Sequence, residues 1–537
     1  MTTPVTMDEQ LQQQQPVLPS AATESNSHVW IPEVVERVAN FLPRNDVAST
    51  LRLVSKSWAA PLSGPEYTVV HLSQQAQPHA FKERWGAPGA MRNLTFAQRL
   101  QLLCLVARTG SISNLQVAVE AAGIALPTPE CKVVTKAAAL AGQRNTCNWL
   151  LQHGCPMRND TMEAVARAGQ RESCEWLRRT GLAFGLGTVL AAARGGHLDL
   201  MEWLLQQQPP LHGTGATELL AAQAEGCELE PLQQFYQEDI VEEGVWLDDM
   251  NKERVLSAAA KSPTSDWQAK VEWLEELGFP KHPSACVAAA TCPDALTRLV
   301  WLHGRGYRAC KASVSAAVRA GNTAAVEYLL AEVHVQLESP IYEATGQLQM
   351  LQLLQVHGCP LDESLVVEAA LQGHLPALAW LVDTMGLKGQ SMLSAAASSG
   401  RVEVLSWLYE RGYRWDEETM RQAADAGCEE VLEWLVEKGC PWGLDPYTAA
   451  ADHGDMATLR WLRRRGCPWK YSSSGGTFVS CMKMSCCKPV LRWMREEGCP
   501  VNWVRAFSLA RRVQPQLLLW LRQQRQAEER RQQEGQQ

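Results

Sequence analysis

The chain has 537 residues, of which 46% are hydrophobic and 20% are charged, and its net charge at pH 7 is −8. This composition is typical of a folded protein with an ample core, and the acidic balance argues against general nucleic-acid binding, which needs a basic surface. No run of 18 or more apolar residues occurs, so the sequence predicts no membrane-spanning helix and no membrane partner.

Residues 1–28 are predicted to form a disordered, Gln-rich tail. They contain no apolar run that could act as a secretory signal. Acidic residues precede Arg37, the first arginine of the chain, which argues against an organellar transit peptide. The 17 cysteines are therefore expected to be reduced thiols, and the protein is expected in the cytoplasm, the nucleus or both.

Residues 29–62 predict a small helical module. Pro32 suits the first turn of a helix, and Pro43 ends that helix. Asp46 is an N-cap candidate for a second helix over residues 47–58. The first helix carries an apolar stripe that consists of Val34, Val35, Val38, Phe41 and Leu42. So small a unit cannot bury these side chains by itself, and it therefore needs the rest of the chain or a partner.

The order of residues in this module matches a known motif. The matching positions are Ile31-Pro32-Glu33, Leu42-Pro43, Asp46 and the segment Leu-Val-Ser-Lys-Ser-Trp at 53–58. They resemble the F-box, by which substrate receptors dock on the Skp adaptor of cullin-RING ubiquitin ligases. The resemblance implies a Skp-type adaptor as partner. It implies adaptor-binding roles for Ile31, Pro32, Val35, Val38, Leu42, Pro43, Val54 and Trp58. The other interpretation is a helical cap on the repeats that follow.

Residues 63–97 are predicted to connect this module to the rest of the chain. The segment Tyr67–Leu72 is expected to form a short strand, and residues 79–86 are expected to form a helix. Neither segment contains a motif with known chemistry, so the connector carries no functional expectation of its own.

Trp residues recur with a regular period across residues 98–525. The 27-residue series are Trp149, Trp176 and Trp203; Trp380, Trp407, Trp434 and Trp461; and Trp493 and Trp520. The slots between them are filled by Trp273, Trp301, Tyr328 and Leu353. So regular a spacing predicts a tandem array of short repeats. Residues 526–537 are expected to be a disordered tail beyond the last repeat.

Residues 449–469 show the pattern of one repeat. Three alanines end a first helix, and Gly454 follows in the position favoured for a left-handed C-terminal residue. A second, amphipathic helix places Met456, Leu459 and Trp461 at three-and-four spacing, and Gly466 ends it. Small alanines let first helices approach closely, whereas Trp and Leu fill the space between second helices. We therefore expect a curved solenoid with a concave face.

The repeat also has a family resemblance. The Ala-Ala-x-x-Gly-His-Leu core at residues 192–198 resembles the ankyrin repeat, and the Gly-Cys-Pro-Trp junctions at 439–442 and 466–469 are similar to those of short ankyrin-like repeats of algae and other protists. Ankyrin units usually have about 33 residues, so these lack about six, which we assign to the hairpin finger. The resemblance implies an all-α, ankyrin-like helix-turn-helix solenoid that binds proteins through first helices and short loops.

Two intervals depart from the period. Seventy residues separate Trp203 from Trp273, with an acidic insert at 238–249, and 32 residues separate Trp461 from Trp493, with extra residues at 472–476. Each insert is either a tolerated loop, since loop length costs little stability, or a specificity loop on the binding face.

Candidate target-binding residues lie in the loops after the prolines of the repeats and at the starts of first helices. Aromatic and charged side chains on a rigid surface are typical anchors for protein recognition. The candidates are Arg158, Asp160, Glu163, Asp362, Trp415, Asp416, Glu418, Arg421, Trp442, Asp445 and Tyr447. The alternative is that the tryptophans pack between repeats and that the acidic residues only keep the surface soluble.

Other residue patterns indicate structure and not chemistry. Five cysteines stand between Gly and Pro, one per repeat, too far apart to share a zinc ion, so buried thiols are predicted at Cys155, Cys359, Cys440, Cys467 and Cys499. His197 and His374 are expected to hydrogen-bond backbone at their turns. No phosphate-binding, hydrolase, metalloprotease or kinase motif is complete. We expect no catalytic, metal or cofactor site.

These features favour a substrate-recognition adaptor of a cullin-RING ligase, in which the solenoid holds an unknown target protein for ubiquitin transfer. Such an adaptor contributes positioning and no catalysis of its own. The alternative is a protein–protein interaction scaffold without a ligase link, whose N-terminal helices only cap the array.

Overall fold

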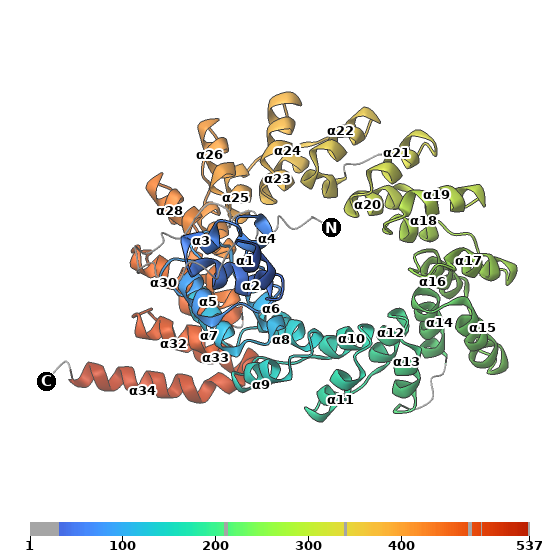
Figure 1. Ribbon diagram of the computed structural model, residues 1–537. Helices are drawn as coiled ribbons and strands as arrows, with labels where there is room; N and C mark the ends of the chain where they lie inside the picture. Colours follow the sequence, from blue (N-terminus) through green and yellow to red (C-terminus); the bar gives the residue numbers. More distant parts are fainter. Residues whose placement is uncertain (1–31, 209–212, 338–340, 471–474, 485, 535–537) are drawn as a thin grey trace. The chain divides into compact units, whose positions relative to one another are not determined.

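The computed structural model describes residues 32–208, 213–337, 341–470, 475–484 and 486–534 (Figure 1). Within these ranges every extended regular element is a helix, and the helices stack as repeats. The all-α repeat solenoid predicted from the sequence is therefore confirmed. The chain divides into two units, one formed by residues 157–392 and the other by residues 3–156 together with 393–537.

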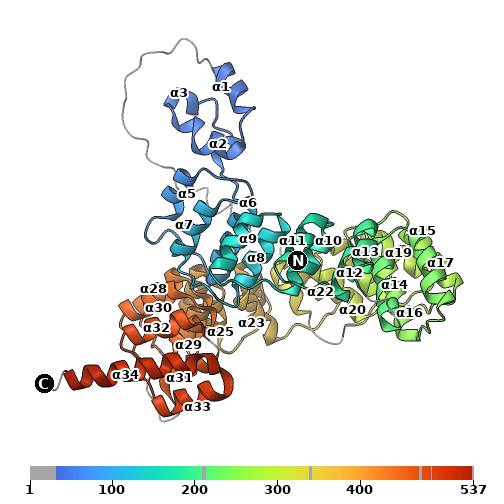
Figure 2. The same ribbon diagram turned by 90° about the horizontal axis from the view of Figure 1, so that it is seen from below.

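The second of these units begins with the small module, whose helices α1, α2 and α3 pack around one another (Figure 2). Its elements and those of the connector are α1 (Pro32–Ala39), α2 (Arg44–Ser49), η2 (Leu51–Leu53), α3 (Lys56–Ala59), α4 (Pro65–Thr68) and α5 (Pro78–Trp85). The helix predicted at 79–86 is confirmed by α5. The tail at 1–28 and Ile31 lie outside the described residues.

The predicted second helix of the module is wrong in two respects. Its segment is broken into α2, η2 and α3, because Thr50 leaves the helical conformation at φ −137° and the side chain of Ser55 caps α3 by accepting from the Trp58 amide. Asp46 is not an N-cap, since α2 starts directly after Pro43 and the Asp46 carboxylate accepts instead from Gln77 Nε2 at 2.8 Å.

The strand predicted at Tyr67–Leu72 does not form. Gly64 and Pro65 start the helical turn α4, which already includes Tyr67. At the end of the predicted strand, the side chain of the buried Asn45 makes the hydrogen bonds that a neighbouring strand would otherwise make. It accepts from the His71 amide at 2.7 Å and donates to the carbonyls of His71 and Gln75. Because this side chain already provides hydrogen-bond partners for the backbone groups there, they do not need to pair with a second strand.

The repeats of residues 157–392 are helix pairs in two layers. In Figure 1, α10, α12, α14 and α16 lie in one layer, and α11, α13, α15 and α17 lie in the other. The helices are α10 (Asn159–Arg167), α11 (Arg171–Arg179), α12 (Leu186–Arg194), α13 (Leu198–Leu205), α14 (Thr214–Gly226), α15 (Leu229–Phe235), η3 (Tyr236–Glu242), α16 (Asp249–Ala260), α17 (Trp267–Glu276), α18 (Ser284–Ala289), α19 (Ala295–Gly304), α20 (Lys311–Arg319), α21 (Thr323–Ala331), η4 (Tyr342–Gly346), α22 (Leu348–Val356), α23 (Glu363–Leu371), α24 (Leu375–Ala379) and η5 (Trp380–Thr384).

The repeats of the other unit come from both ends of the chain. The earlier stretch contains α6 (Phe96–Thr109), α7 (Ile112–Ala122), α8 (Cys131–Leu140) and α9 (Arg144–Gln152). The later stretch contains α25 (Met392–Ser398), α26 (Val402–Glu410), α27 (Thr419–Ala426), α28 (Glu429–Glu437), α29 (Pro446–His453), α30 (Met456–Arg464), α31 (Gly476–Lys483), α32 (Lys488–Glu496), α33 (Trp503–Val513), η6 (Pro515–Leu517) and α34 (Leu518–Glu534).

The repeat pattern predicted at residues 449–469 is confirmed by α29 and α30. Gly454 follows α29 with φ +69°, the left-handed conformation that glycine adopts without strain. Ala449 and Ala450 are buried in α29, which packs against α27 and α31, and Leu459 and Trp461 are buried in α30. The helix predicted to end near Gly466 ends at Arg464.

The 70-residue interval between Trp203 and Trp273 contains a whole helix pair that the Trp period misses. This pair is α14 and α15, and its second helix has no tryptophan. The acidic insert is partly helical, because Tyr236–Glu242 continue α15 as π-helical turns. Tyr236 packs edge-on against Trp273 at 5.4 Å. The loop predicted at 238–249 is therefore wrong for residues 238–242. Of the second insert, residues 471–474 lie outside the described ranges.

The disordered tail predicted at 526–537 is also corrected. Helix α34 continues to Glu534, and residues 535–537 lie outside the described ranges. Ion pairs hold part of this extension in place: Arg495 contacts Glu528 at 2.9 Å and Arg525 contacts Glu529 at 2.9 Å. The pair at 525 and 529 has the spacing of one helical turn, which favours continuation of the helix.

The cysteines of the Gly-Cys-Pro turns are buried free thiols, as predicted: Cys155, Cys359, Cys440, Cys467 and Cys499. Burial raises the pKa of Cys440, Cys467 and Cys499 to about 12. The thiols therefore stay protonated near neutral pH and act as small apolar groups in the turns between repeats.

His197 and His374 lie at the turns where backbone hydrogen bonds are predicted for them. Both stand at the N-cap of a second helix, and neither side chain caps it. The His197 ring packs instead over Gly169 of the preceding repeat, where a Cβ atom would come within 2.5 Å of the ring. These histidines fill the space above the glycine turn of the neighbouring unit.

Candidate interaction surfaces

The N-terminal module has a core of its own. Val35, Ala39, Val47, Leu51 and Leu62 are buried together, with Val38, Trp58 and Tyr67 packed against them. Val35 therefore cannot serve as the adaptor contact expected from the F-box resemblance, because it is fully occupied inside the module. Val38 and Trp58 are half-buried and brace the same core. Pro32 begins α1.

Four large apolar side chains of the module are exposed. Phe41 is 84% exposed, Leu42 39%, Leu53 44% and Val54 60%. Phe41 and Leu42 lie in the turn between α1 and α2, together with the exposed Pro43. Leu53 ends η2, and Val54 directly follows it. We call Phe41, Leu42, Leu53 and Val54 the exposed apolar set. Sequence reasoning assigned Leu42, Pro43 and Val54 to adaptor contacts, but it omitted Phe41 and Leu53 from that list.

The module is tied to the following residues by polar contacts. The Asn45 side chain bonds the backbone of residues 71–75, and Asn114 of α7 donates through Nδ2 to the carbonyl of Ala76 at 2.8 Å. Both asparagines are buried, and a buried amide without partners would be costly. These bonds therefore fix residues 71–76 of the connector, from the module on one side and from α7 on the other.

Four predicted target-binding residues are accessible on the unit of residues 157–392. Arg158, Asp160 and Glu163 are exposed at the start of α10, and Asp362 is exposed at the start of α23. Asp362 also accepts from the Ser364 amide and so caps α23. These positions remain available for a partner.

Two of the candidates around α27 and α29 are engaged inside the protein. Tyr447 is fully buried, stacks on Trp469 with ring centroids 4.1 Å apart, and donates its hydroxyl to the Cys467 carbonyl. Asp445 accepts from the Tyr447 amide and from Thr477, and burial raises the pKa of its carboxyl group. The target-binding role predicted for Tyr447 is wrong because its side chain is fully buried. Asp445 caps α29 and is partly buried, and its target-binding role stays a prediction.

The predicted anchor Trp415 also packs between repeats. Its ring stacks on Tyr409 at 4.9 Å and meets Trp434 edge-on at 6.1 Å. Asp416 accepts from the side chain of Ser394 in the preceding repeat and from Thr419. Trp415 therefore packs against neighbouring rings, as the alternative for the tryptophans predicts, and Asp416 is hydrogen-bonded within the protein. Both side chains are partly exposed, and their target-binding roles stay predictions.

The remaining candidates near α27 are partly accessible. Glu418 and Arg421 form an ion pair one helical turn apart, and Trp442 is half-buried. A surface ion pair of this kind contributes little stability, so both charges can exchange partners at small cost.

A contact that the sequence did not reveal joins α6 to the later repeats. Arg99 of α6 is buried and forms an ion pair with Asp455, which is equally buried, through Nη1 and Oδ1 at 2.9 Å. The guanidinium also donates to the carbonyls of Ala122 and Gly427. The sequence gives two local indications of this contact. One is an arginine within an apolar helix, and the other is an aspartate at the N-cap of a second helix, where other repeats carry His197 or Asn322.

Backbone pairing completes this junction. The Ala125 amide donates to the Gly454 carbonyl at 3.0 Å, and the Ala457 amide donates to the Gly123 carbonyl at 3.2 Å. Close approach is possible because residue 123 is glycine: a Cβ atom there would lie 2.7 Å from the Cβ of Ala457. We call these contacts between residues 92–130 and 427–457 the α6–α30 junction.

His453 lies in this junction between two carboxylates. Its ring contacts Asp425 at 3.3 Å and Glu130 at 3.6 Å and stacks on Phe96 at 5.1 Å. Hydrogen bonds to Asp425 and Glu130 raise the pKa of His453 to about 10. The charged imidazolium is therefore favoured in the folded protein at neutral pH.

We expect this histidine to make the junction sensitive to alkaline pH. A pKa raised from 6.5 to about 10 gives stabilisation that is complete below pH 6.5 and is lost as the pH rises to 10. Because the group is partly exposed, the loss should be on the order of 1–2 kcal/mol. Hydrogen exchange of α6 and α29, measured between pH 6.5 and 10, checks this predicted loss of stability. In His453→Gln this part of the pH dependence should vanish; an unchanged pH profile would contradict the assignment.

In the described ranges, no helix is both long and apolar enough to span a bilayer. Over the same residues, no group of three or more His, Cys, Asp or Glu side chains is placed to hold a metal ion.

Comparisons with known proteins add little. No protein-family model matches the chain, and no curated protein matches it. Among solved structures, the pentatricopeptide repeat protein PPR10 from maize has 12% identity and a TM-score of 0.24, over 80% of this chain and 69% of that chain. Two structures of PPR10 in complex with an 18-nucleotide psaJ RNA element have 13% identity and TM-scores of 0.26, over 89% of this chain and 76% of theirs. Scores this low carry no argument about a ligand.

Proposed function

We propose that the protein is a substrate-recognition adaptor of an SCF-type cullin-RING ubiquitin ligase. The N-terminal module docks on a Skp-type adaptor, and the ankyrin-like repeats hold a target protein. The observation that carries the proposal is the exposed apolar set of the module, on a unit whose sequence resembles the F-box. Exposed large apolar side chains that adjoin a rigid core are typical of protein interfaces.

The module's own core supports this role. Because Val35, Val47 and Leu62 already fill the interior, the exposed side chains keep their positions without a partner. Docking then costs little conformational ordering, which favours affinity. Phe41 and Val54 are the strongest anchor candidates, since they are the most exposed of the set.

The repeats supply the second half of the function. Stacked helix pairs form a rigid support for side chains such as Arg158, Asp160 and Glu163, which are exposed at the start of α10. A target held there would have its lysines at high effective concentration near the ligase's conjugating enzyme. The protein itself would perform no chemical step.

Co-purification of the full-length chain with a Skp-type adaptor tests the docking half. We expect Phe41→Asp combined with Val54→Asp to weaken adaptor binding by about a hundredfold or more, because two anchors worth roughly 1–2 kcal/mol each are replaced by charges. The matched control is Val504→Asp, which changes a side chain that is 79% exposed but lies on α33. It should leave adaptor binding unchanged.

The scaffold alternative predicts a different set of results. If the module is only a cap, the full-length chain does not bind the adaptor, and deletion of residues 29–62 mainly destabilises α5 to α7. The bonds of Asn45 to the connector favour this second role. Adaptor binding that survives deletion of residues 29–62 would refute the docking proposal.

A further inference from the structure

The C-terminal repeats are far more basic than the rest of the chain. Between residues 456 and 525, Lys and Arg number 14 and Asp and Glu number 2, in a chain whose net charge is −8. Some of these cations are neutralised within the repeats. Arg463 pairs with Glu497 at 3.4 Å, and Arg495 pairs with Glu528 at 2.9 Å.

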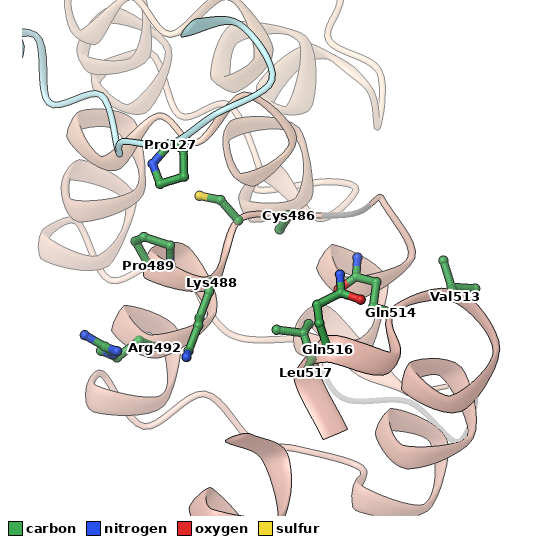
Figure 3. Close-up of a pocket in the computed structure, with 10 residues that line it drawn as sticks. Pro127, Cys486, Lys488, Pro489, Arg492, Val513, Gln514, Gln516 and Leu517 are labelled. Carbon is green, nitrogen blue, oxygen red and sulfur yellow. The ribbon is translucent and has the colours of Figure 1, made fainter. Parts of the chain in front are cut away.

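A hollow of about 710 Å³ lies within this basic region (Figure 3). Its lining comes from the start of α32, from the turn between α33 and α34, and from the segment after α7. Pro127, Pro489, Val513 and Leu517 supply apolar surface, and Lys488 and Arg492 supply positive charge. Figure 3 shows the side chains of Lys488 and Arg492 next to each other on one side and Leu517 on the other.

The cations at the hollow have no carboxylate partner among the described residues. Lys488 and Arg492 are exposed, and within the described ranges neither forms an ion pair with an acidic side chain. Arg511 and Arg512, which directly precede Val513 in the lining, are also exposed and unpaired in the described part of the chain. Like charges so placed repel one another, and an anionic ligand would relieve that repulsion.

A second hollow adjoins the first, and its lining includes carboxylates. It shares Pro489 and Arg492 with the first hollow, but Glu120 and Glu496 line it as well. The lining of the first hollow contains no carboxylate. Anionic groups are therefore favoured on the Lys488 side and disfavoured on the Glu496 side.

We propose that this hollow binds an acidic segment of the target protein, with Glu or Asp side chains on Lys488 and Arg492 and an apolar side chain against Pro489 and Leu517. The inference rests on the proposed function, because it names the class of target that the repeats would hold. A mixed lining of apolar surface and cations suits a peptide that carries both kinds of side chain.

A peptide fits the hollow better than single-stranded nucleic acid. Proteins that bind single-stranded DNA or RNA combine a basic groove with aromatic rings on which the bases stack. No aromatic ring lines this hollow. Trp493 lines the adjoining hollow, but it is only 9% exposed, so little of its ring is free for a base to stack on.

Fluorescence anisotropy with the full-length protein tests the proposal. The probe is a labelled peptide that alternates Glu with Leu, compared with the same peptide carrying Gln in place of Glu. We expect the Glu peptide to bind more tightly and binding to weaken as salt is raised. Lys488→Glu combined with Arg492→Glu should weaken binding by about tenfold or more. The matched control is Arg401→Glu combined with Lys438→Glu, which reverses two exposed charges, one just before α26 and one just after α28, and should change binding by less than about twofold.

Several outcomes would overturn the proposal. One is equal binding of the Glu and Gln peptides; another is an equal loss in both double variants. A third is tighter binding of single-stranded oligouridine, lost in Lys488→Glu with Arg492→Glu, which would assign the site to nucleic acid. Circular dichroism of each variant excludes unfolding as the cause. Adaptor co-purification on the same samples separates the two hypotheses, since this site can fail while docking of residues 29–62 succeeds.

Discussion

Replacing Arg99 with Met should destabilise the unit that contains the α6–α30 junction by about 3–5 kcal/mol. The Arg99 and Asp455 side chains are only 3% and 1% exposed. Met fills much of the same volume, but it leaves the Asp455 carboxylate buried without its cation and leaves two carbonyls without a donor. Hydrogen exchange of α6 and α27 should accelerate first, with urea unfolding followed by circular dichroism as the second measurement.

The double variant Arg99→Met with Asp455→Asn is the control for this result. Asn keeps the cap on α30, because Asp455 accepts from the Thr458 amide and an asparagine oxygen can do the same. It also removes the uncompensated charge. The double variant should therefore recover at least about 1 kcal/mol relative to Arg99→Met. A single variant as stable as the wild type would show that the buried pair does not hold the junction.

Truncation of Tyr447 to Ala should cost about 3–5 kcal/mol, the loss typical of a large aromatic side chain removed from a core. Tyr447 is fully buried and its ring stacks on Trp469 of the next repeat segment. Tyr447→Phe keeps the ring and loses only the hydroxyl bond to the Cys467 carbonyl, so it should cost about 1 kcal/mol. Chemical unfolding of the three proteins measures both differences.

The same series separates packing from recognition. Asp160→Ala changes an exposed residue at the start of α10 and should alter stability by less than about 0.5 kcal/mol. If Tyr447 contacted a target directly, Tyr447→Phe would weaken target binding while Tyr447→Ala left stability unchanged. That pattern would contradict the buried position of the ring.

The helix pairs could be predicted from the sequence because their signals are local. Gly454, Leu459 and Trp461 lie within one unit, and the turn and the amphipathic helix follow from their spacing alone. The target-binding role given to Tyr447 failed because its stacking partner, Trp469, belongs to the following turn. An aromatic residue after a proline turn looks the same in the sequence whether it faces a partner or a neighbouring repeat.

The module was predictable in outline and not in detail. The apolar stripe of α1 indicates a buried face, but it does not tell which members point inward, so Val35 was assigned to an interface and Phe41 was not. The bonds of Asn45 with residues 71–75 decided against a strand, and no local pattern marks them. The 27-residue period relates neighbouring repeats only, so it gives no indication that Arg99 pairs with Asp455.

The buried pair of Arg99 and Asp455 has a consequence for protein synthesis. Its two members are separated by 356 residues, so at roughly 5–20 residues per second the ribosome needs about 20–70 s to deliver Asp455 after Arg99. During that time the ribosome has made α6, with Arg99 and Phe96, but has not yet made their partners Asp455 and His453. We expect the nascent chain to depend on chaperones over this interval, and formation of the junction to be among the last steps of folding.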